Sequence, residues 1–184
     1  MSSICVFCGS NSGKNQIYSK LAKDVGEIIA ERNDTLVYGG GSIGLMGTVA
    51  DSCLNIGGQV IGIIPEYLNK LEVGHKNLTR LLIVKDMFER KSKMEKLSDG
   101  FFILPGGVGT LDELFEMITL AQLKQHIKPV IIFNINKFYD PLIQQIQNCI
   151  KEGFIHKEHL DLFIVADSAS KAFQKFDSFN NKLN

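Results

Sequence analysis

Residues 101–113 read Phe101-Phe102-Ile103-Leu104-Pro105-Gly106-Gly107-Val108-Gly109-Thr110-Leu111-Asp112-Glu113. The short apolar run at the start predicts a buried strand. The apolar positions further on recur with helical spacing, at Leu111, Leu114, Phe115, Ile118 and Leu123. Between the two patterns lies a run of small residues. The stretch therefore predicts a strand, a glycine-rich turn and a helix in direct succession.

The same strand and helix patterns alternate along the whole chain. Further apolar runs predict strands at 4–8, 35–38, 59–64, 81–84, 130–133 and 162–165. Several are apolar throughout, which is typical of parallel strands covered on both faces. Helical stripes separate them, at Ile17, Leu21, Val25, Ile28 and Ile29 and again at Leu142, Ile143, Ile146 and Ile150. We expect an α/β, doubly wound, mostly parallel, Rossmann-like fold, and a single domain over residues 1–184 because no linker interrupts the pattern.

Composition excludes several classes of function. The 184-residue chain has 20 Lys+Arg and 20 Asp+Glu, a formal charge of zero. This balance argues against a nucleic-acid-binding protein, because phosphate backbones are bound by clustered excess cations. No run approaches the about 20 apolar residues of a membrane span, and residues 1–7 lack the basic start of a signal peptide. We expect a cytoplasmic protein without a membrane partner.

The cysteines fit that compartment as reduced thiols. Cys5 and Cys8 form a lone C-x-x-C within a predicted strand, where positions three apart point to opposite faces. No second pair completes a zinc site, and a redox role is the less favoured alternative. His156-x-x-His159 likewise lacks further ligands, so we expect a surface turn and no metal site.

Two more glycine-rich turns follow predicted strands. They are Gly9-Ser10-Asn11-Ser12-Gly13 and Gly39-Gly40-Gly41-Ser42-Ile43-Gly44. In open parallel sheets, ligands bind beyond the carboxyl ends of the strands, where such turns meet helix N-termini. Three turns at one edge predict a site where backbone amides approach an anion, with Gly9, Ser10, Gly40 and Gly41 among the binding residues. For these two turns, the alternative is that glycine serves only the sterics of a tight turn.

Each of these two turns also resembles a nucleotide motif imperfectly. Gly39-x-Gly41-x-x-Gly44 matches the dinucleotide fingerprint, with Glu66 near the place of the ribose-binding acid, but it follows the second strand instead of the first. The first turn, with Lys14, has three residues between its glycines where a P-loop has four, and Asn15 replaces Ser/Thr. An NAD(P)-dependent oxidoreductase remains a weak alternative, and a triphosphate site is disfavoured.

The third turn leads into a helix that is rich in acids. The amides expected to converge on a phosphate there are those of Gly107, Val108, Gly109 and Thr110. Asp112, Glu113 and Glu116 follow in the opening turns. Thr110-x-x-Glu113 fits a capping box, which would make Glu113 structural. Alternatively, Glu113 faces positive charge that forms during a reaction, such as a ribosyl oxocarbenium ion close to a 5′-phosphate.

A cationic pair is predicted at the same edge. Arg90 and Lys91 open the helix after the fourth predicted strand, within Asp86-Met87-Phe88-Glu89-Arg90-Lys91-Ser92-Lys93-Met94. The helix dipole disfavours cations in a first turn, which argues for a function. Arginine suits a planar partner such as phosphate or carboxylate. The alternative is a solvated helix face.

Together, two of these motifs resemble a known family. Pro105-Gly106-Gly107-Val108-Gly109-Thr110-x-x-Glu113, preceded by Met87-x-x-Arg90-Lys91-x-x-Met94, is similar to the paired signature of the LONELY GUY family of cytokinin riboside 5′-monophosphate phosphoribohydrolases, whose bacterial members also resemble AMP nucleosidases. The similarity extends to Val6-Phe7-Cys8-Gly9-Ser10, Tyr38-Gly39-Gly40-Gly41, Gly44-Leu45-Met46-Gly47, Ala121-Gln122-Leu123 and His126-x-Lys128-Pro129.

The resemblance implies a Rossmann-like homodimer that needs no cofactor or metal. It would hydrolyse the N-glycosidic bond of a purine nucleoside 5′-monophosphate, a cytokinin riboside monophosphate or AMP, to free base and ribose 5-phosphate. The family's catalytic arginine and glutamate fall on Arg90 and Glu113. Its substrate contacts fall on Glu72, Arg90, Lys91, Gly106, Gly107, Val108, Gly109, Thr110, Leu111, Asp112 and Thr119.

The chain departs from the family pattern at three positions. Phe88, Leu120 and Lys124 stand where relatives commonly have His, Trp and Gly, and the departures at Leu120 and Lys124 bear on base preference more than on the reaction. Members of the family are also labelled lysine decarboxylases, but no feature of the sequence supports a pyridoxal cofactor. A non-catalytic nucleotide or cofactor carrier would use the same glycine turns, and the Arg-Lys plus Glu combination argues against it.

Overall fold

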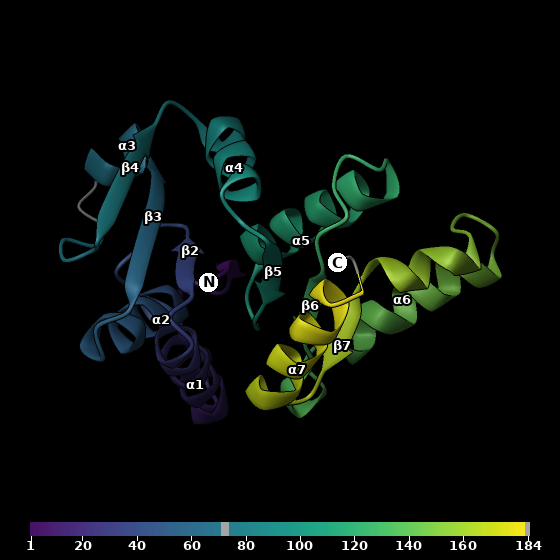
Figure 1. Ribbon diagram of the computed structural model, residues 1–184. Helices are drawn as coiled ribbons and strands as arrows, with labels where there is room; N and C mark the ends of the chain where they lie inside the picture. Colours follow the sequence, from purple (N-terminus) through teal and green to yellow (C-terminus); the bar gives the residue numbers. More distant parts are fainter. Residues whose placement is uncertain (71–73, 183–184) are drawn as a thin grey trace.

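The computed structural model describes residues 1–70 and 74–182. Within these ranges, seven parallel strands form one sheet in the order β4-β3-β2-β1-β5-β6-β7 (Figure 1). Their bounds are β1 (Ser3–Phe7), β2 (Thr35–Tyr38), β3 (Gln59–Pro65), β4 (Arg80–Val84), β5 (Gly100–Ile103), β6 (Val130–Phe133) and β7 (Ile164–Ala166). The doubly wound α/β fold expected from the sequence is confirmed. The last strand was predicted at 162–165, and this is wrong at its start, because residues up to Leu162 form a 3₁₀ helix.

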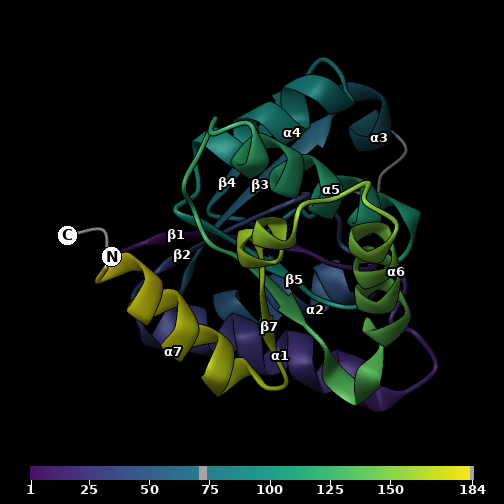
Figure 2. The same ribbon diagram turned by 90° about the vertical axis from the view of Figure 1, so that its right-hand side faces the viewer.

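Helices cover both faces of the sheet. One face carries α1 (Gln16–Glu31), α2 (Gly44–Asn55) and α7 (Ala169–Asn180), and the other carries α4 (Met87–Lys96), α5 (Val108–Gln122) and α6 (Asp140–Lys151). Figure 2 shows α4 and α5 on one side of the sheet and α1 and α7 on the other. Short segments complete the chain: α3 (Glu66–Lys70), η1 (Ile135–Lys137) and η2 (Lys157–Leu162). None of the helices within the described ranges is both long and apolar enough to cross a bilayer.

Strand β1 shows how the sheet divides the core. Ile4 and Val6 pack among the side chains of α1, α2 and α7, whereas Cys5 and Phe7 pack with those of α4, α5 and α6. Cys8 lies on the face opposite Cys5, as expected for positions three apart in an extended chain. Both are buried free thiols, and burial raises the pKa of each above its ordinary value. The two cysteines therefore act as small core side chains.

The sheet reverses its winding between β1 and β5. The chain leaves β1 toward β2 on one side, and leaves β5 toward β6 on the other. The loops after these strands consequently flank a crevice at their carboxyl ends, the usual ligand position in such sheets. Gly9 N donates to Pro105 O at 3.1 Å, and Leu45 N donates to Gly9 O at 3.0 Å. These bonds join the three glycine-rich turns at one edge of the sheet.

Helices α4 and α5 begin in different ways. Asp86 caps α4 by accepting from Glu89 N at 2.9 Å, and the Glu89 side chain accepts from Lys85 N at 2.8 Å. Helix α5 has Gly107 at its N-cap and no side-chain cap. The capping box considered for Thr110 and Glu113 is therefore wrong, because the helix starts at Val108 and places Thr110 inside its first turn.

Candidate active site

A cavity of about 480 Å³ opens at the carboxyl ends of β1 and β2, between α4 and the start of α5. This volume falls within the range of about 300–1,000 Å³ that is usual for small-molecule sites. The lining residues are Val6, Phe7, Cys8, Gly9, Ser10, Asn11, Gly39, Met46, Leu68, Met87, Arg90, Gly107, Val108, Gly109, Thr110 and Glu113. They come from strand β1, from three loops and from four helices that are distant in the sequence.

A buried ion pair forms one wall of the cavity. Arg90 Nη1 on α4 donates to Glu113 Oε1 on α5 at 2.8 Å, and both side chains are less than a tenth exposed. Arg90 Nε donates to the carbonyl oxygen of Ile63 in β3 at 3.2 Å. The guanidinium is thus fixed by a side chain and by the backbone of the sheet. Glu113 accepts from Arg90 and does not fold back onto the start of its own helix.

Gly39 makes room for that guanidinium. A Cβ atom built at Gly39 would lie 1.9 Å from Arg90 Nη2 and 3.1 Å from Arg90 Cζ. The backbone of Gly39 does not occupy the left-handed region, so its conformation alone does not demand glycine. Its position in the dinucleotide-like pattern is therefore explained by the close approach of Arg90 to the end of β2.

The carboxyl group of Glu113 occupies an unusual electrostatic environment. Burial raises the pKa of Glu113 above the ordinary value of 4.5, with Arg90 opposing the shift and Asp112 adding to it. Cys8, which lines the same cavity, has its pKa raised first by burial and then by the charge of Glu113. Cys8 therefore remains a thiol at neutral pH. Among the described lining residues, Glu113 is the group placed to exchange a proton or to face a cation.

The start of α5 presents backbone amides to the same cavity. The first amides of an α-helix have no partner within the helix, and no side chain caps α5. Val108, Gly109 and Thr110 line the cavity at this point. A Cβ at Gly106 would lie 2.9 Å from Gly9 N and 2.1 Å from Thr110 Oγ1, so glycine there lets the two loops meet. Such a helix start attracts anions through its amides and its dipole.

Asp112 and Glu116 of α5 share one cationic partner on α4. Lys91 Nζ lies 2.9 Å from Asp112 Oδ2 and also forms an ion pair with Glu116. Burial opposes the charge on Lys91, but the bonds to Glu116 and Asp112 outweigh it and raise the pKa of Lys91. Each cation of the Arg90-Lys91 pair therefore has acidic partners on α5. Each of the three carboxylates near this anion-attracting helix start thereby has a cationic partner on α4.

The structure brings some of the predicted site residues together and separates others. Gly9, Ser10, Arg90, Glu113 and residues 107–110 surround the cavity. Its described lining does not include Gly40, Gly41, Lys91, Gly106, Leu111, Asp112 or Thr119. Glu72 lies outside the described residues.

The predicted residues that do not line the cavity have other positions. Gly40 and Gly41 hold the segment after residue 73, because Gly40 O accepts from His75 N at 2.9 Å and Gly41 forms a bridge with Gly74. Leu111 is partly buried against the core. Thr119 is exposed on α5, about 9 Å along the helix axis from Glu113 at 1.5 Å per residue.

Sequence reasoning missed several lining residues. Cys8 and Asn11 could have been found from the rule that strand ends hold the ligand, because both follow β1. Met46, Leu68 and Met87 carry no chemical signal and are identified only by their place in the fold. The rings of His156, which precedes η2, and His159 within it contact each other at 5.6 Å between centroids. The described residues contain no cluster of three or more metal-ligand side chains.

The fold and site define a Rossmann-like α/β protein with an anion-attracting helix start and a buried acid at its switch point. Residues 46–176 match the family model described as "possible lysine decarboxylase". The cytokinin riboside 5′-monophosphate phosphoribohydrolase LOG3 of Arabidopsis thaliana is 44% identical over 176 residues, which cover 96% of this chain and 82% of the relative. LOG5 of the same plant is 43% identical, with 96% and 77% covered. The chain belongs to this family, the LONELY GUY phosphoribohydrolases, and the resemblance seen in the sequence is confirmed.

Solved structures with the same fold are more distant in sequence. The molybdenum cofactor binding protein from Rippkaea orientalis superimposes with a TM-score of 0.72 at 22% identity, over 96% of each chain. The Moco carrier protein from Chlamydomonas reinhardtii gives a TM-score of 0.72 at 19% identity, over 98% of each chain. At these identities the similarity establishes the fold.

Proposed function

We propose that this protein hydrolyses the N-glycosidic bond of purine nucleoside 5′-monophosphates, releasing the free base and ribose 5-phosphate. Cytokinin riboside 5′-monophosphate and AMP are the candidate substrates. The observation that carries the proposal is the buried Arg90–Glu113 pair, which shares one cavity with the uncapped start of α5. Relatives that are more than 40% identical are named as phosphoribohydrolases, which supports the proposed reaction.

Binding follows from the charges of the cavity. The 5′-phosphate is held by the amides of Val108, Gly109 and Thr110, and the α5 dipole adds about 0.3–1 kcal/mol of attraction. Ser10, which lines the same cavity, offers a hydroxyl to the phosphate or ribose. A ribose attached to that phosphate then reaches toward Glu113.

Glu113 acts on the charge that forms as the bond breaks. When the bond from C1′ to the base nitrogen breaks, the base leaves with the electron pair and the ribosyl group becomes an oxocarbenium ion. The Glu113 carboxylate stabilises this cation and accepts a proton from the water whose oxygen bonds to C1′. The base nitrogen takes up a proton from solvent and Glu113 returns its proton to solvent, so that one water is consumed and the carboxylate is restored. Arg90 fixes the carboxylate in position before the substrate binds.

Incubation of the purified protein with AMP, and in parallel with an N6-substituted AMP, tests this proposal. Chromatography should show free base and ribose 5-phosphate in equal amounts. Tight NAD(P) binding without base release would instead indicate an oxidoreductase. Nucleotide binding without turnover would indicate a carrier, and either result would contradict the proposal.

We further propose that the protein acts as a homodimer. Helices α4 and α5 carry exposed apolar side chains, including Phe88 at 81% and Phe115 at 43% exposure. Thr119 is too far along α5 to join the cavity of its own chain, and a second copy would give it a partner site. Light scattering should give the mass of a dimer, and Phe115→Glu should shift it toward the monomer. A wild-type monomer with full activity would contradict this.

We also propose a cytoplasmic location. The four cysteines are free thiols, which suits a reducing compartment. Cell fractionation tests this, and recovery of the protein from an oxidising compartment would contradict it.

A further inference from the structure

A second cavity of about 250 Å³ adjoins the active-site cavity. The two cavities share Gly9, Ser10, Asn11 and Gly107 in their linings. The second one extends toward α1 and the segment between η1 and α6, whereas Arg90 and Glu113 line only the first. A ligand bound at the backbone amides that start α5 would therefore lie close to both cavities.

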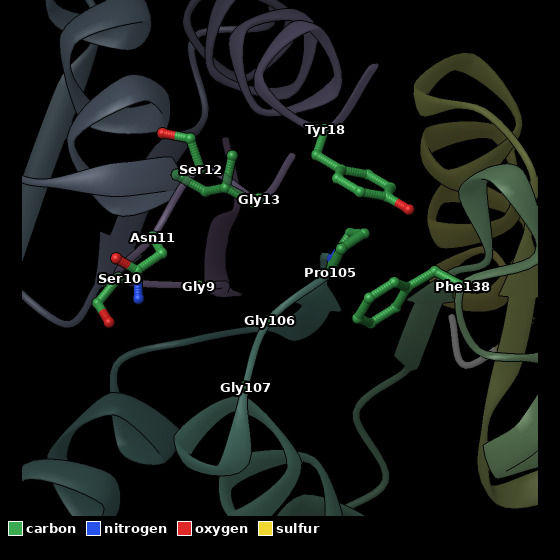
Figure 3. A pocket seen from close by; sticks show the side chains of 11 residues that line it. Gly9, Ser10, Asn11, Ser12, Gly13, Tyr18, Pro105, Gly106, Gly107 and Phe138 are labelled. Carbon is green, nitrogen blue, oxygen red and sulfur yellow. The ribbon is translucent and has the colours of Figure 1, made fainter. Parts of the chain in front are cut away.

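Two aromatic rings form a wall of the second cavity. Tyr18 of α1 and Phe138 contact each other edge to face, with ring centroids 5.6 Å apart and an interplanar angle of 71°. Figure 3 shows both rings beside Pro105, and residues 9–13 line the same cavity. Leu45 adds a further apolar contact. We call this cavity, lined by residues 9–13, Tyr18, Leu45, residues 105–107 and Phe138, the aromatic pocket.

The polar groups of the aromatic pocket are all neutral. Ser10, Asn11 and Ser12 supply hydroxyl and amide groups, and the glycines expose backbone. No Asp, Glu, Lys, Arg or His occurs among the described residues that line it. A charged group would lose its hydration there without gaining an ionic partner. Flat rings with hydrogen-bonding edges match both the walls and the neutral polar groups.

We propose that the aromatic pocket binds an uncharged planar ring of nucleobase size. Its volume is below the range of about 300–1,000 Å³ usual for larger ligands, so it suits one ring system and not a whole nucleotide. The identity of the ring rests on the proposed function. It is the base released by hydrolysis, or the base of a second nucleotide joined through the phosphate at the start of α5.

The sequence contains no tryptophan, so a single introduced tryptophan can report on binding without background from other tryptophans. Tyr18→Trp places a sole Trp in the wall of the aromatic pocket. Titration with free adenine should change its fluorescence saturably. Adding Phe138→Ala should weaken the apparent affinity about tenfold, within the range for loss of one base–aromatic contact. Phe154→Ala, which removes an exposed phenylalanine outside this lining, should leave the affinity unchanged.

A second probe separates the two sources of the ring. Diadenosine pyrophosphate can place one nucleotide in the active-site cavity and its second adenine in the aromatic pocket. A response to free adenine supports the released base as the ligand, and a response to the dinucleotide alone supports a second nucleotide. If neither probe changes the fluorescence, or if Phe138→Ala leaves the response unaltered, the proposal is overturned.

One further measurement keeps the outcome clear. Equilibrium dialysis of labelled adenine against wild-type protein and Phe138→Ala replaces the fluorescence titration if Tyr18→Trp does not fold, and equal binding by the two proteins would overturn the proposal. Both assays measure binding without turnover. A protein that binds adenine through Phe138 but does not release it from AMP would retain the aromatic pocket and contradict only the proposed hydrolysis.

Discussion

Arg90 Nη1 donates to Glu113 Oε1 at 2.8 Å, and this bond joins α4 to α5 inside the protein. Removing water from both charges is costly, and loss of one partner from a buried pair typically destabilises a protein by about 3–5 kcal/mol. The two charges therefore stay paired, because separating them would leave each one buried without a partner. A carboxylate positioned in this way needs little reorganisation when a cation forms beside it.

Glu113→Gln should separate chemistry from binding. The amide keeps the shape and can accept the bond from Arg90, but it lacks the negative charge that acts in the transition state. We expect kcat for AMP to fall by about 10²–10⁴-fold, with affinity for AMP changed only several-fold. Steady-state kinetics and calorimetry measure the two effects. Glu116→Gln, one turn along α5, is the matched control, and near-normal turnover of Glu113→Gln would exclude a catalytic role.

The loss of activity on the acid side of the pH profile should reflect protonation of Glu113. Burial raises the pKa of this carboxyl group, and the reaction requires its ionised form, so kcat/KM should fall as pH decreases, with a midpoint above 4.5. Asp112 contributes to the raised pKa, and Asp112→Asn should move the midpoint to lower pH. If the midpoint instead reflected the pKa of the substrate phosphate, Asp112→Asn would not shift it. An identical profile for Asp112→Asn would therefore assign the midpoint to the substrate.

Gly39→Ala should impair the site through Arg90. The added methyl group occupies the place of Nη2, so the guanidinium must shift and its bond to Glu113 is strained or lost. We expect kcat/KM to fall by about 10²–10³-fold, the usual cost of losing one preorganised charged contact, in the same direction as Arg90→Ala. Gly40→Ala is the contrasting neighbour, because Gly40 has a φ of +75° and its substitution should lower stability. Unchanged kinetics for Gly39→Ala would contradict this explanation.

Lys124→Gly should stabilise the fold. Lys124 follows α5 with a φ of 57°, and Gln125 N donates to Leu120 O at 2.8 Å, the hydrogen-bond pattern of a helix end that favours glycine. The left-handed conformation costs a side-chain-bearing residue about 1–2 kcal/mol, which the greater freedom of unfolded glycine partly offsets. We expect the free energy of unfolding to rise by about 0.5–1 kcal/mol in denaturant titrations.

Asn33→Gly is the control for that substitution. Asn33 adopts the same conformation after α1, at a φ of 57°, but asparagine tolerates it better than lysine. The free energy of unfolding should therefore rise less for Asn33→Gly than for Lys124→Gly. An equal rise in the free energy of unfolding for both variants, or a fall for Lys124→Gly, would contradict the proposed backbone strain at Lys124.

The sequence predicted those features that depend on local pattern. Apolar runs such as Val130–Phe133 identified the strands, because buried parallel strands leave little room for polar residues. Once the strands were placed, the parallel sheet required the turns at Gly9 and Pro105 to share an edge. Arg90 and Glu113 followed from the motifs, and the structure places them in contact.

Features that depend on three-dimensional packing could not be predicted in this way. Thr110 and Glu113 fit a capping box, yet the extended backbone at Gly107 starts the helix earlier. Side-chain capping occurs at the start of α4 instead, where Asp86 accepts from Glu89 N and Glu89 accepts from Lys85 N. The pairing of Lys91 with Asp112 depends on how α4 lies against α5.

The aromatic pocket depends on packing in the same way. Tyr18 and Phe138 meet only because the segment after β6 returns beside the start of α1. No short-range spacing encodes such a contact.

The bond from Arg90 Nε to the oxygen of Ile63 has an evolutionary consequence. A main-chain carbonyl is supplied by every amino acid, so mutation of the Ile63 codon can alter the packing of β3 without deleting this support. Descendants of this gene can therefore repack the core around β3 while one anchor of the Arg90 guanidinium stays where it is. Changes in the core are in this way kept separate from the support of the guanidinium.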